Sequence, residues 1–383
     1  MDITNDIKYV GIDDKKIRFF EGQFPVSDGM KYNSYLIMDE KITIMDSVDF
    51  EFAQEWINKI KSALKDKTPY YLVVQHMEPD HSGSIVELIK EFPNIIIISS
   101  SKSFDMMKNY FDHDYIENRI VIEDDDIISL GKHKLRFFSA PMVHWPEVFI
   151  SHDIIDNVLF SADAFGKFGT ASDESNWIDE ARRYYFGIVG KYGLQVANLL
   201  KKLSDLDVKI ICSLHGPVLK NNIQYYIDTY NKWANYISED DGILVAYTSV
   251  YGNTRKAVEI LDKEINKYNV NYEIINLQKT DVSYAIAKAF KYKKLIIATT
   301  TYNAHLFPHM YNFIHHLIHR NFKDKIIGLI ENGSWAPMSN KIIMDLFAKN
   351  KIIFLDKNVS IKSSIKEKNI IDIIGLVDEL IKL

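Results

Sequence analysis

LVVQHMEPDHSGS, the stretch from Leu72 to Ser84, begins as an apolar run and continues with four side chains of metal-binding type. These four are His76, Glu78, Asp80 and His81. An apolar run of this length is typical of a buried strand, and a loop at a strand end is held firmly enough to aim ligands. If the backbone stays extended, residues 76, 78 and 80 point to one side and His81 aims differently. The stretch predicts a site where one ion takes the 76/78 arm and a second ion the 80/81 arm.

Three further ligand-type residues follow short apolar strands in the same half of the chain. His144 lies in SAPMVHWPEV, Asp163 in LFSADAFG and His215 in CSLHGPV. Any one of them taken singly is typical of a turn or a capping residue. The joint order, H-x-E-x-D-H and then H, D and H at strand ends, indicates a two-metal site. Five other histidines belong to the second half and are interpreted as surface or ligand-lining residues: His305, His309, His315, His316 and His319.

Composition bounds the class of protein. A chain of 383 residues is long enough for two domains, and 47% apolar residues support real cores. The formal charge of −6 argues against a nucleic-acid partner. The one cysteine, Cys212, excludes a disulfide within the chain and a four-cysteine iron–sulfur site. The polar, acidic N-terminus is no signal peptide and the apolar runs are too short to span a bilayer, so we expect a cytoplasmic protein without a membrane partner.

The first part of the chain, about 235 residues, is predicted to fold as an α+β sandwich. Short apolar runs separated by turns indicate strands, for example IRFFEG, KITIMDS, YYLVVQ, NIIIISS and LRFFSA. Helical spacing of apolar residues predicts helices over Phe50–Leu64, Ser84–Phe92, Ser101–Tyr110, Asp179–Leu203 and Asn222–Ile237. Hairpin-like strands with interspersed helices favour two sheets with helices outside.

The pattern changes at ISEDDG, Ile237 to Gly242, an acidic, glycine-ended link. We therefore expect a first domain at 1–238 and a second at 242–383. Strands and helices alternate strictly after the link, beginning with ILVAY and ending with a helix over Ile365–Leu383. Five such βα units predict a doubly wound parallel sheet, an α/β fold covered on both faces.

The second domain begins with a strand that runs into TSVYGNT, Thr248 to Thr254, and then a helix. Backbone N–H groups and hydroxyls at a helix start bind anions. Gly252 permits the tight turn, Ser249, Asn253 and Thr254 add side-chain donors, and the loop contains no Lys or Arg. The loop is neither a Rossmann fingerprint nor a Walker A loop. Taken alone, such a turn is equally typical of a plain helix cap.

Two later loops strengthen this interpretation. TTTYNAHLFP, Thr299 to Pro308, and ENGSWAP, Glu331 to Pro337, both follow strands of the second domain. Doubly wound sheets bind ligands at the carboxyl ends of their strands. Tyr302 and Trp335 are candidates to flank a planar ring, with ordinary loop packing as the alternative.

The metal motif resembles the metallo-β-lactamase fold, whose two-metal sites use H-x-H-x-D-H followed by His, Asp and His. Glu78 departs from that pattern by replacing an imidazole with a carboxylate, which makes the pocket harder and favours iron. With this change, and with the three loops of the second domain, nearly the whole chain resembles the flavodiiron proteins, also called A-type flavoproteins. The resemblance implies an N-terminal metallo-β-lactamase-like αββα sandwich followed by a flavodoxin-like doubly wound parallel sheet.

Carried over residue by residue, the resemblance implies two iron ions with an oxo or hydroxo bridge. One iron is expected on His76, Glu78 and His144, the other on Asp80, His81 and His215, with Asp163 between them. In some members the first His lies off the metal, so direct ligation by His76 stays open. FMN is expected in the three loops, on Ser249, Val250, Tyr251, Gly252, Asn253, Thr254, Thr301, Tyr302, Asn303, Ala304, Gly333, Ser334, Trp335 and Ala336. No catalytic side chain is expected beyond the iron ligands, and Trp145, Tyr184 and Tyr185 are candidates to line a gas pocket.

The resemblance also implies an activity and partners. FMN relays electrons from an external donor, such as a rubredoxin or a reductase, to a diiron site that reduces O₂ to water, NO to N₂O, or both. With one cysteine the chain carries no fused rubredoxin, so the donor is expected to be a separate protein. A head-to-tail homodimer, or a dimer of such dimers, brings one subunit's FMN beside the other's irons. The sequence leaves the preference between O₂ and NO open.

Two other functions remain compatible with the residues. A zinc-dependent hydrolase fused to a flavodoxin-like module uses a metal-bound hydroxide to attack an ester or lactam, and Glu78 argues against it. An electron-transfer module with a structural metal site is the third alternative, and it consumes no gas.

Overall fold

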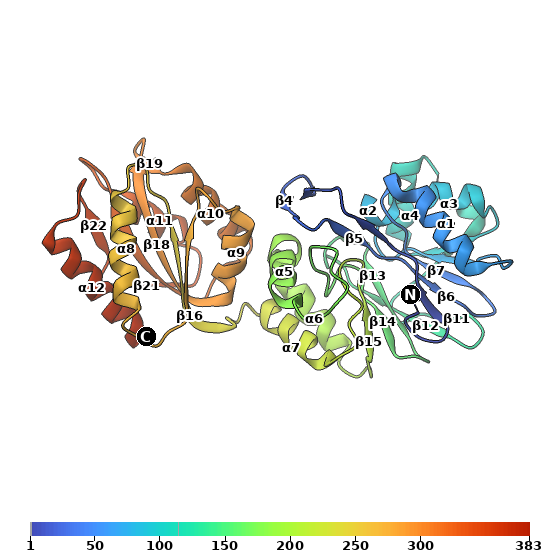
Figure 1. The fold of residues 1–383 in the computed structure, drawn as a ribbon. Coiled ribbons are helices and arrows are strands. Elements are labelled where there is room, and N and C mark those ends of the chain that lie inside the picture. Colours follow the sequence, from blue (N-terminus) through green and yellow to red (C-terminus); the bar gives the residue numbers. More distant parts are fainter. Residues whose placement is uncertain (1, 114) are drawn as a thin grey trace. The chain divides into compact units, whose positions relative to one another are not determined.

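The structure, a computed structural model, describes residues 2–113 and 115–383. The chain forms two compact units, Met1–Ala234 and Asn235–Leu383 (Figure 1). The acidic link lies at the start of the second unit, and its residues from Asp240 onward already belong to the first strand there. Within the described ranges, no helix is both long and apolar enough to cross a bilayer.

Two mixed sheets form the centre of the first unit. The six-stranded sheet has the order β1-β6-β7-β8-β9-β10, and its strands from β7 to β10 are parallel. The five-stranded sheet has the order β11-β12-β13-β14-β15 and is antiparallel except for β14 and β15. The bounds are β1 Ile7–Tyr9, β6 Tyr35–Ile37, β7 Thr43–Met45, β8 Tyr71–Val73, β9 Ile96–Ser99, β10 Arg119–Val121, β11 Ile127–Ser129, β12 Lys134–Ser139, β13 Phe149–Asp153, β14 Val158–Phe160 and β15 Ile210–Cys212.

Alternating side chains of the strands build two cores. In β8, Tyr71 and Val73 pack between the two sheets with Phe137, whereas Leu72 packs on the outer face. Successive side chains of a strand point to opposite faces, and both faces here are covered, so the strand is apolar throughout. The outer core contains Trp56 from the helix over the six-stranded sheet.

Helices cover the outer faces of both sheets (Figure 1). Those beside the six-stranded sheet are α1 Ala53–Leu64, α3 Ile85–Glu91 and α4 Ser101–Phe111. Those beside the five-stranded sheet are α5 Trp177–Tyr184, α6 Gly193–Lys202 and α7 Ile223–Ala234. Two small antiparallel pairs, β2 Ile12–Asp14 with β5 Met30–Tyr32 and β3 Phe19–Phe20 with β4 Phe24–Pro25, complete the unit. The predicted αββα sandwich is confirmed.

One predicted helix of this unit is wrong. The segment Asp179–Leu203 is not continuous, because α5 is followed by a π-helical turn at Tyr185–Val189 and a 3₁₀ turn at Gly190–Tyr192 before α6 begins. Three glycines, Gly187, Gly190 and Gly193, lie within seven residues and weaken the α-helix there. A side chain at Gly187 would meet the ring of Phe24 at 3.0 Å, so close packing favours glycine at this break.

The second unit is a parallel sheet with the strand order β17-β16-β18-β20-β21. Numbered along the chain, this is the order 2-1-3-4-5 of flavodoxin-like folds. The strands are β16 Asp240–Tyr247, β17 Tyr272–Asn276, β18 Tyr292–Tyr302, β20 Lys325–Asn332 and β21 Ile352–Phe354, with short additions at β19 His305–Leu306 and β22 Val359–Ile361. The predicted doubly wound sheet is confirmed, and β22 was not predicted.

Helices lie on both faces of this sheet (Figure 1). One contacting pair of helices is α8 (Asn253–Ile265) and α12 (Glu367–Lys382). A second contacting pair is α9 (Val282–Lys291) and α10 (Pro308–His319). Helix α11 Ser339–Leu346 packs against β18 and β20. The three central strands, β16, β18 and β20, are mostly buried, and their carboxyl-terminal loops remain accessible to a ligand.

Candidate metal centre and flavin pocket

The ligand-rich loop after β8 does not stay extended as far as Asp80, which was the condition for residues 76, 78 and 80 to point to one side. Pro79 begins a short helical turn, α2 (Pro79–Ser82), in which the backbone N–H of His81 donates to the carbonyl of Glu78 at 2.9 Å. Proline is well suited to the first position of a helix. Asp80 lies in this turn, so it does not continue the alternation that His76 and Glu78 begin.

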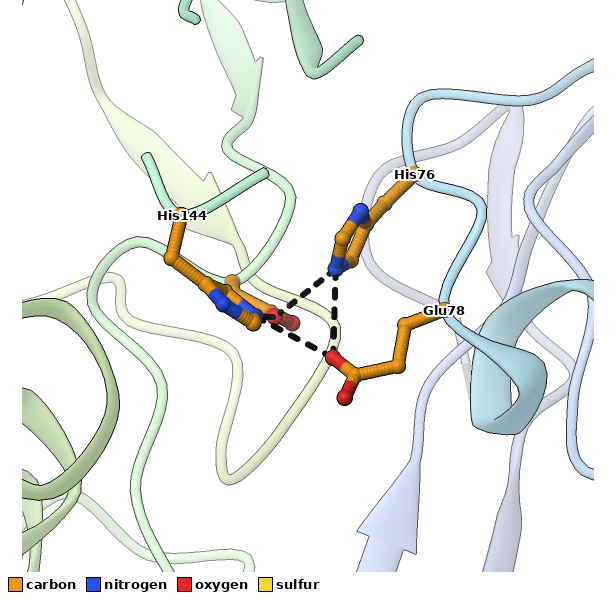
Figure 2. Close-up of side chains that lie close together, drawn as sticks. His76, Glu78 and His144 are labelled. Carbon is orange, nitrogen blue, oxygen red and sulfur yellow. Dashed lines mark hydrogen bonds and ion pairs between the residues drawn. The ribbon is translucent and has the colours of Figure 1, made fainter. Parts of the chain in front are cut away.

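The pair His76 and Glu78 lies next to two residues that follow distant strands, His144 and Asp163. The Nε2 atoms of His76 and His144 lie 3.2 and 3.1 Å from Oε2 of Glu78 (Figure 2). Oδ2 of Asp163 lies 2.9 Å from Nε2 of His144 and 3.4 Å from Nε2 of His76. Four ligand atoms therefore converge on one small space, which is the arrangement that a bound cation requires.

The pair Asp80 and His81 lies next to His215. The Nε2 atoms of His81 and His215 are 3.0 Å apart, and Oδ2 of Asp80 lies 3.3 Å from each of them. Oδ1 of Asp163 lies 3.3 Å from Nε2 of His81 and 3.6 Å from Nε2 of His215. Asp163 thus directs one oxygen to each group. We call the seven residues together the metal centre: His76, Glu78, Asp80, His81, His144, Asp163 and His215.

Two outer contacts orient the rings. The Nδ1 atom of His76 lies 2.8 Å from Oε1 of the fully buried Glu147, which also accepts the backbone N–H of Met77. Nδ1 of His215 donates to the backbone carbonyl of Lys31 at 2.6 Å. A ring that donates from Nδ1 keeps the Nε2 lone pair free for a metal when it is neutral. Both outer contacts therefore favour metal binding through Nε2, including at His76.

The metal centre attracts positive charge. Burial opposes charging of His144, but Asp163 and Glu78 outweigh it and raise the pKa of His144 to about 9. Burial likewise opposes charge on Asp163, yet the surrounding imidazoles hold the pKa of that carboxyl well below its usual value. Carboxylates that stay ionised inside a buried pocket need cations beside them, whether protons on histidine or metal ions.

Several buried carboxylate oxygens of the metal centre accept no hydrogen bond from the part of the chain that the structure describes, although Oδ2 of Asp80 and Oδ1 of Asp163 lie 3.3 Å from imidazole nitrogens. Both carboxylate oxygens of Asp80 and Oδ1 of Asp163 have no hydrogen-bond partner among the described residues. Leaving buried oxygens unsatisfied is costly, and metal ions held by these carboxylates would satisfy them. Four imidazoles and three carboxylates form a mixed nitrogen and oxygen donor set that suits iron. The residues present therefore fit a pair of iron ions.

Aromatic rings lie next to the metal centre. The ring of Trp145 is 5.2 Å from that of His76, and the ring of Tyr184 is 5.4 Å from that of His215. Tyr185, the third candidate for a gas pocket, packs on Trp233 at 5.3 Å instead. Of the three aromatic residues predicted to line a gas pocket, Trp145 and Tyr184 therefore lie next to the metal centre.

A separate pocket of about 410 Å³ lies at the carboxyl ends of β16, β18 and β20. We call it the flavin pocket. Of the predicted residues, all but Gly252 line it; the additional lining residues are Thr300, Asn332, Met338 and Ser363. Gly252 has φ +88° and caps α8, so it sets the turn that brings Asn253 and Thr254 to the pocket.

The flavin pocket has the donors and rings that a flavin requires. The hydroxyl of Thr254 is buried and, among the described residues, has no hydrogen-bond partner. It stands in the first turn of α8, where the helix dipole favours an anion. Trp335 is 87% exposed; Tyr302 is 45% exposed and packs against Phe307 in a T-shaped contact at 5.6 Å. Both line the pocket, where their rings are candidates to cover a planar ligand. The residues present fit a flavin with a terminal phosphate.

Comparison with known proteins agrees with both halves of the chain. Residues 30–216 match the family model described as ODP family beta lactamase, and residues 244–358 match that of a flavodoxin domain. The anaerobic nitric oxide reductase flavorubredoxin of Vibrio vulnificus is 30% identical over 346 residues, which cover 87% of this chain and 70% of that protein. The chain belongs to the flavodiiron proteins.

Solved structures of flavodiiron proteins share the fold over the whole chain. The rubredoxin oxygen:oxidoreductase of Desulfovibrio gigas matches with a TM-score of 0.92 at 23% identity, covering 100% of this chain and 98% of that one. The flavodiiron protein of Giardia intestinalis matches with a TM-score of 0.91 at 23% identity, covering 99% and 95%. The predicted family and fold class are confirmed, and this flavodiiron protein is an oxidoreductase of that family with a flavodoxin domain that implies a flavin.

Sequence reasoning missed the outer contacts of this flavodiiron protein. Glu147 is in the SAPMVHWPEV stretch, and its only sequence signal is a charged residue just ahead of a buried strand. The carbonyl of Lys31 carries no sequence signal at all. In the flavin pocket, Ser363 follows the unpredicted strand β22, whereas Thr300 and Asn332 adjoin the predicted loop residues.

Proposed function

We propose that this flavodiiron protein reduces a diatomic gas, O₂ to water, NO to N₂O, or both, with electrons from an external donor. The observation that supports this most strongly is the position of Asp163, which directs one carboxylate oxygen to each group of metal-binding side chains. A shared carboxylate between two adjacent groups fits two cations held close together.

The proposed ligands follow the two groups. His76, Glu78 and His144 would hold one iron, Asp80, His81 and His215 would hold the other, and Asp163 would serve both. When bound, the irons and an FMN in the flavin pocket supply the electron chemistry. The predicted FMN-binding residues, including Gly252, are retained in the proposal, and Glu147 acts by orienting His76.

The side chains around the metal centre are suited to proton-consuming reductions. Reduction of O₂ to water takes up four electrons and four protons, and conversion of two NO to N₂O and water takes up two of each. Burial, followed by the nearby carboxylates of Asp163 and Glu78, raises the pKa of Tyr184 well above its usual value. Tyr184, whose ring lies 5.4 Å from that of His215, therefore stays protonated and uncharged at neutral pH.

The proposal includes the electron donor and the assembly. Relatives carry the names flavorubredoxin and rubredoxin oxygen:oxidoreductase, so we take a rubredoxin-type protein as the first donor to test and a reductase as the second. We also include a head-to-tail homodimer, or a dimer of such dimers, and a cytoplasmic location. These features rest on the family, and domain limits of 1–238 and 242–383 belong to the same proposal.

The test is gas consumption by protein loaded with iron and flavin. The protein is reduced anaerobically, supplied with an excess of chemically reduced rubredoxin as electron donor, and exposed to O₂ and to NO in separate experiments, with the gas, peroxide and N₂O measured. We expect repeated turnovers with at least one gas, at about 1–10³ per second, without accumulation of peroxide. The faster gas identifies the preferred substrate.

Two outcomes contradict the proposal. A single oxidation without turnover of either gas identifies an electron carrier. Zinc in place of iron, combined with ester or lactam hydrolysis, identifies a hydrolase. Free FMN with ferrous iron, at the same concentrations, is the control for reactions in solution.

A further inference from the structure

A second group of ligand-type side chains lies at the other end of the five-stranded sheet. The metal centre receives His144 after the end of β12, whereas His133 precedes the start of that strand. Six strand residues separate these ends, which corresponds to about 20 Å. The second group is therefore distinct from the metal centre.

This group, which we call the His133 cluster, consists of His133, Asp153 and Asp156. Their ligand atoms all lie within 4.8 Å of one another. Nδ1 of His133 lies 3.0 Å from Oδ2 of Asp153, which also accepts the backbone N–H of Asp156 at 2.9 Å. His133 and Asp153 are fully buried, and Asp156 is half-buried.

One atom of the His133 cluster lacks a partner. Oδ1 of Asp153 is buried and forms no hydrogen bond with any residue that the structure describes. A buried carboxylate oxygen without a donor is costly, and a cation beside it removes that cost. Oδ1 belongs to the same carboxylate whose Oδ2 contacts Nδ1 of His133. One ion next to Nδ1 is therefore within reach of the His133 ring and of the Asp153 carboxylate.

The surroundings of the His133 cluster are negative. Asp6 lies 3.3 Å from Nε2 of His133, and the carboxylate of Asp39 accepts the backbone N–H groups of His133 and Lys132 at 2.6 and 3.1 Å. The ammonium of Lys132 pairs with Asp6. Four carboxylates thus face one lysine and one imidazole, which leaves an excess of negative charge for a cation to offset.

We propose that His133, Asp153 and Asp156 bind a divalent cation of borderline softness, with zinc as the probe. Imidazole nitrogen with two carboxylates is a donor set of zinc sites, whereas calcium and magnesium take oxygen ligands. Asp6 meets the ring nitrogen opposite the proposed ion, as a carboxylate does behind a metal-bound histidine. Three protein ligands leave a further position for water.

The site joins segments far apart in the chain. Asp6 precedes β1, His133 lies between β11 and β12, and Asp153 and Asp156 lie at the turn between β13 and β14. An ion that binds only the folded chain stabilises it in proportion to the logarithm of its concentration. The proposed role is therefore to fasten the N-terminal segment to the five-stranded sheet, independently of gas reduction.

The experiment uses protein already loaded with iron and flavin. Zinc is titrated by calorimetry, and iron content is measured before and after to show that the metal centre is undisturbed. We expect one zinc ion per chain with the iron retained, and a higher melting temperature in zinc. Asp156→Asn should weaken zinc binding at least about tenfold, His133→Gln should remove it, and Asp6→Asn should weaken it by about 10–100-fold.

Asp66→Asn, an exposed carboxylate change in the same unit, is the matched control and should leave zinc binding unchanged. Asp156→Asn carries the test if His133→Gln does not fold, because Asp156 contributes its side chain from a turn. The proposal is overturned if the wild-type protein takes up no zinc beyond its iron. It is equally overturned if zinc binds Asp156→Asn as tightly as it binds wild type, which would leave the His133 cluster as an ion-pair group without a metal.

Discussion

Asp163→Asn is expected to lower gas turnover at least about a hundredfold while flavin binding stays unchanged. Asp163 is buried and directs Oδ2 to His144 and Oδ1 to His81. An asparagine has the same shape but a single carbonyl oxygen and no charge, so one of the two groups meets an N–H₂ where it needs a ligand. The measurements are turnover with O₂ and NO, iron per chain, and the magnetic coupling of the irons by Mössbauer spectroscopy.

The matched control for this variant is again Asp66→Asn, which removes an exposed carboxylate outside the metal centre. Retained coupling and turnover in Asp163→Asn would show that Asp163 does not serve both irons. Loss of flavin from the same variant would show that the flavin and the irons are not held by separate parts of the chain.

Thr254→Val is expected to weaken FMN binding about 10–100-fold while iron content stays unchanged. The hydroxyl of Thr254 is buried in the first turn of α8 and has no partner within the described ranges. A hydrogen bond to a charged phosphate contributes about 1.5–3 kcal/mol, and valine keeps the shape of threonine without the donor. The measurement is the dissociation constant of FMN by quenching of flavin fluorescence.

Thr280→Val is the control for the flavin pocket, since Thr280 lies in the same unit and does not line the pocket. If FMN binds Thr254→Val as tightly as it binds wild type, the first turn of α8 does not hold the phosphate. Together with Asp163→Asn, this variant tests the assignment of iron and flavin to two different sites by affecting one cofactor at a time.

Much of the metal centre was predictable because strand ends supply its ligands. An apolar strand followed within a few residues by a histidine leaves a local signal, as at His76, His144 and His215, and the joint order of these signals is specific. The loops of the flavin pocket were predictable for the same reason, since parallel strands place their carboxyl-terminal loops at one edge.

Contacts between distant segments were not predictable. Glu147 meets His76 across 71 residues, and the carbonyl of Lys31 meets His215 across 184 residues. A backbone carbonyl is present at every position, so its use as a partner depends on the tertiary fold alone. The helical turn at Pro79 had a local signal in the proline itself, but the alternation of ligand types before it favoured an extended backbone.

Errors in the predicted elements have local causes. The break between α5 and α6 contains three glycines within seven residues. The prediction of one continuous helix gave more weight to the apolar spacing on either side of them. Strand β22 has three residues, Val359–Ile361, too few for alternation to be recognised, and its pairing with β20 is what brings Ser363 to the flavin pocket.

The most direct test is a crystal of protein grown with ample iron, measured by anomalous scattering at the iron edge. We predict two iron peaks per chain, one bound by His76, Glu78 and His144 and the other by Asp80, His81 and His215, with an oxygen of Asp163 on each. An empty pocket, or zinc there without iron, would contradict the assignment of these seven side chains to a redox-active pair of ions.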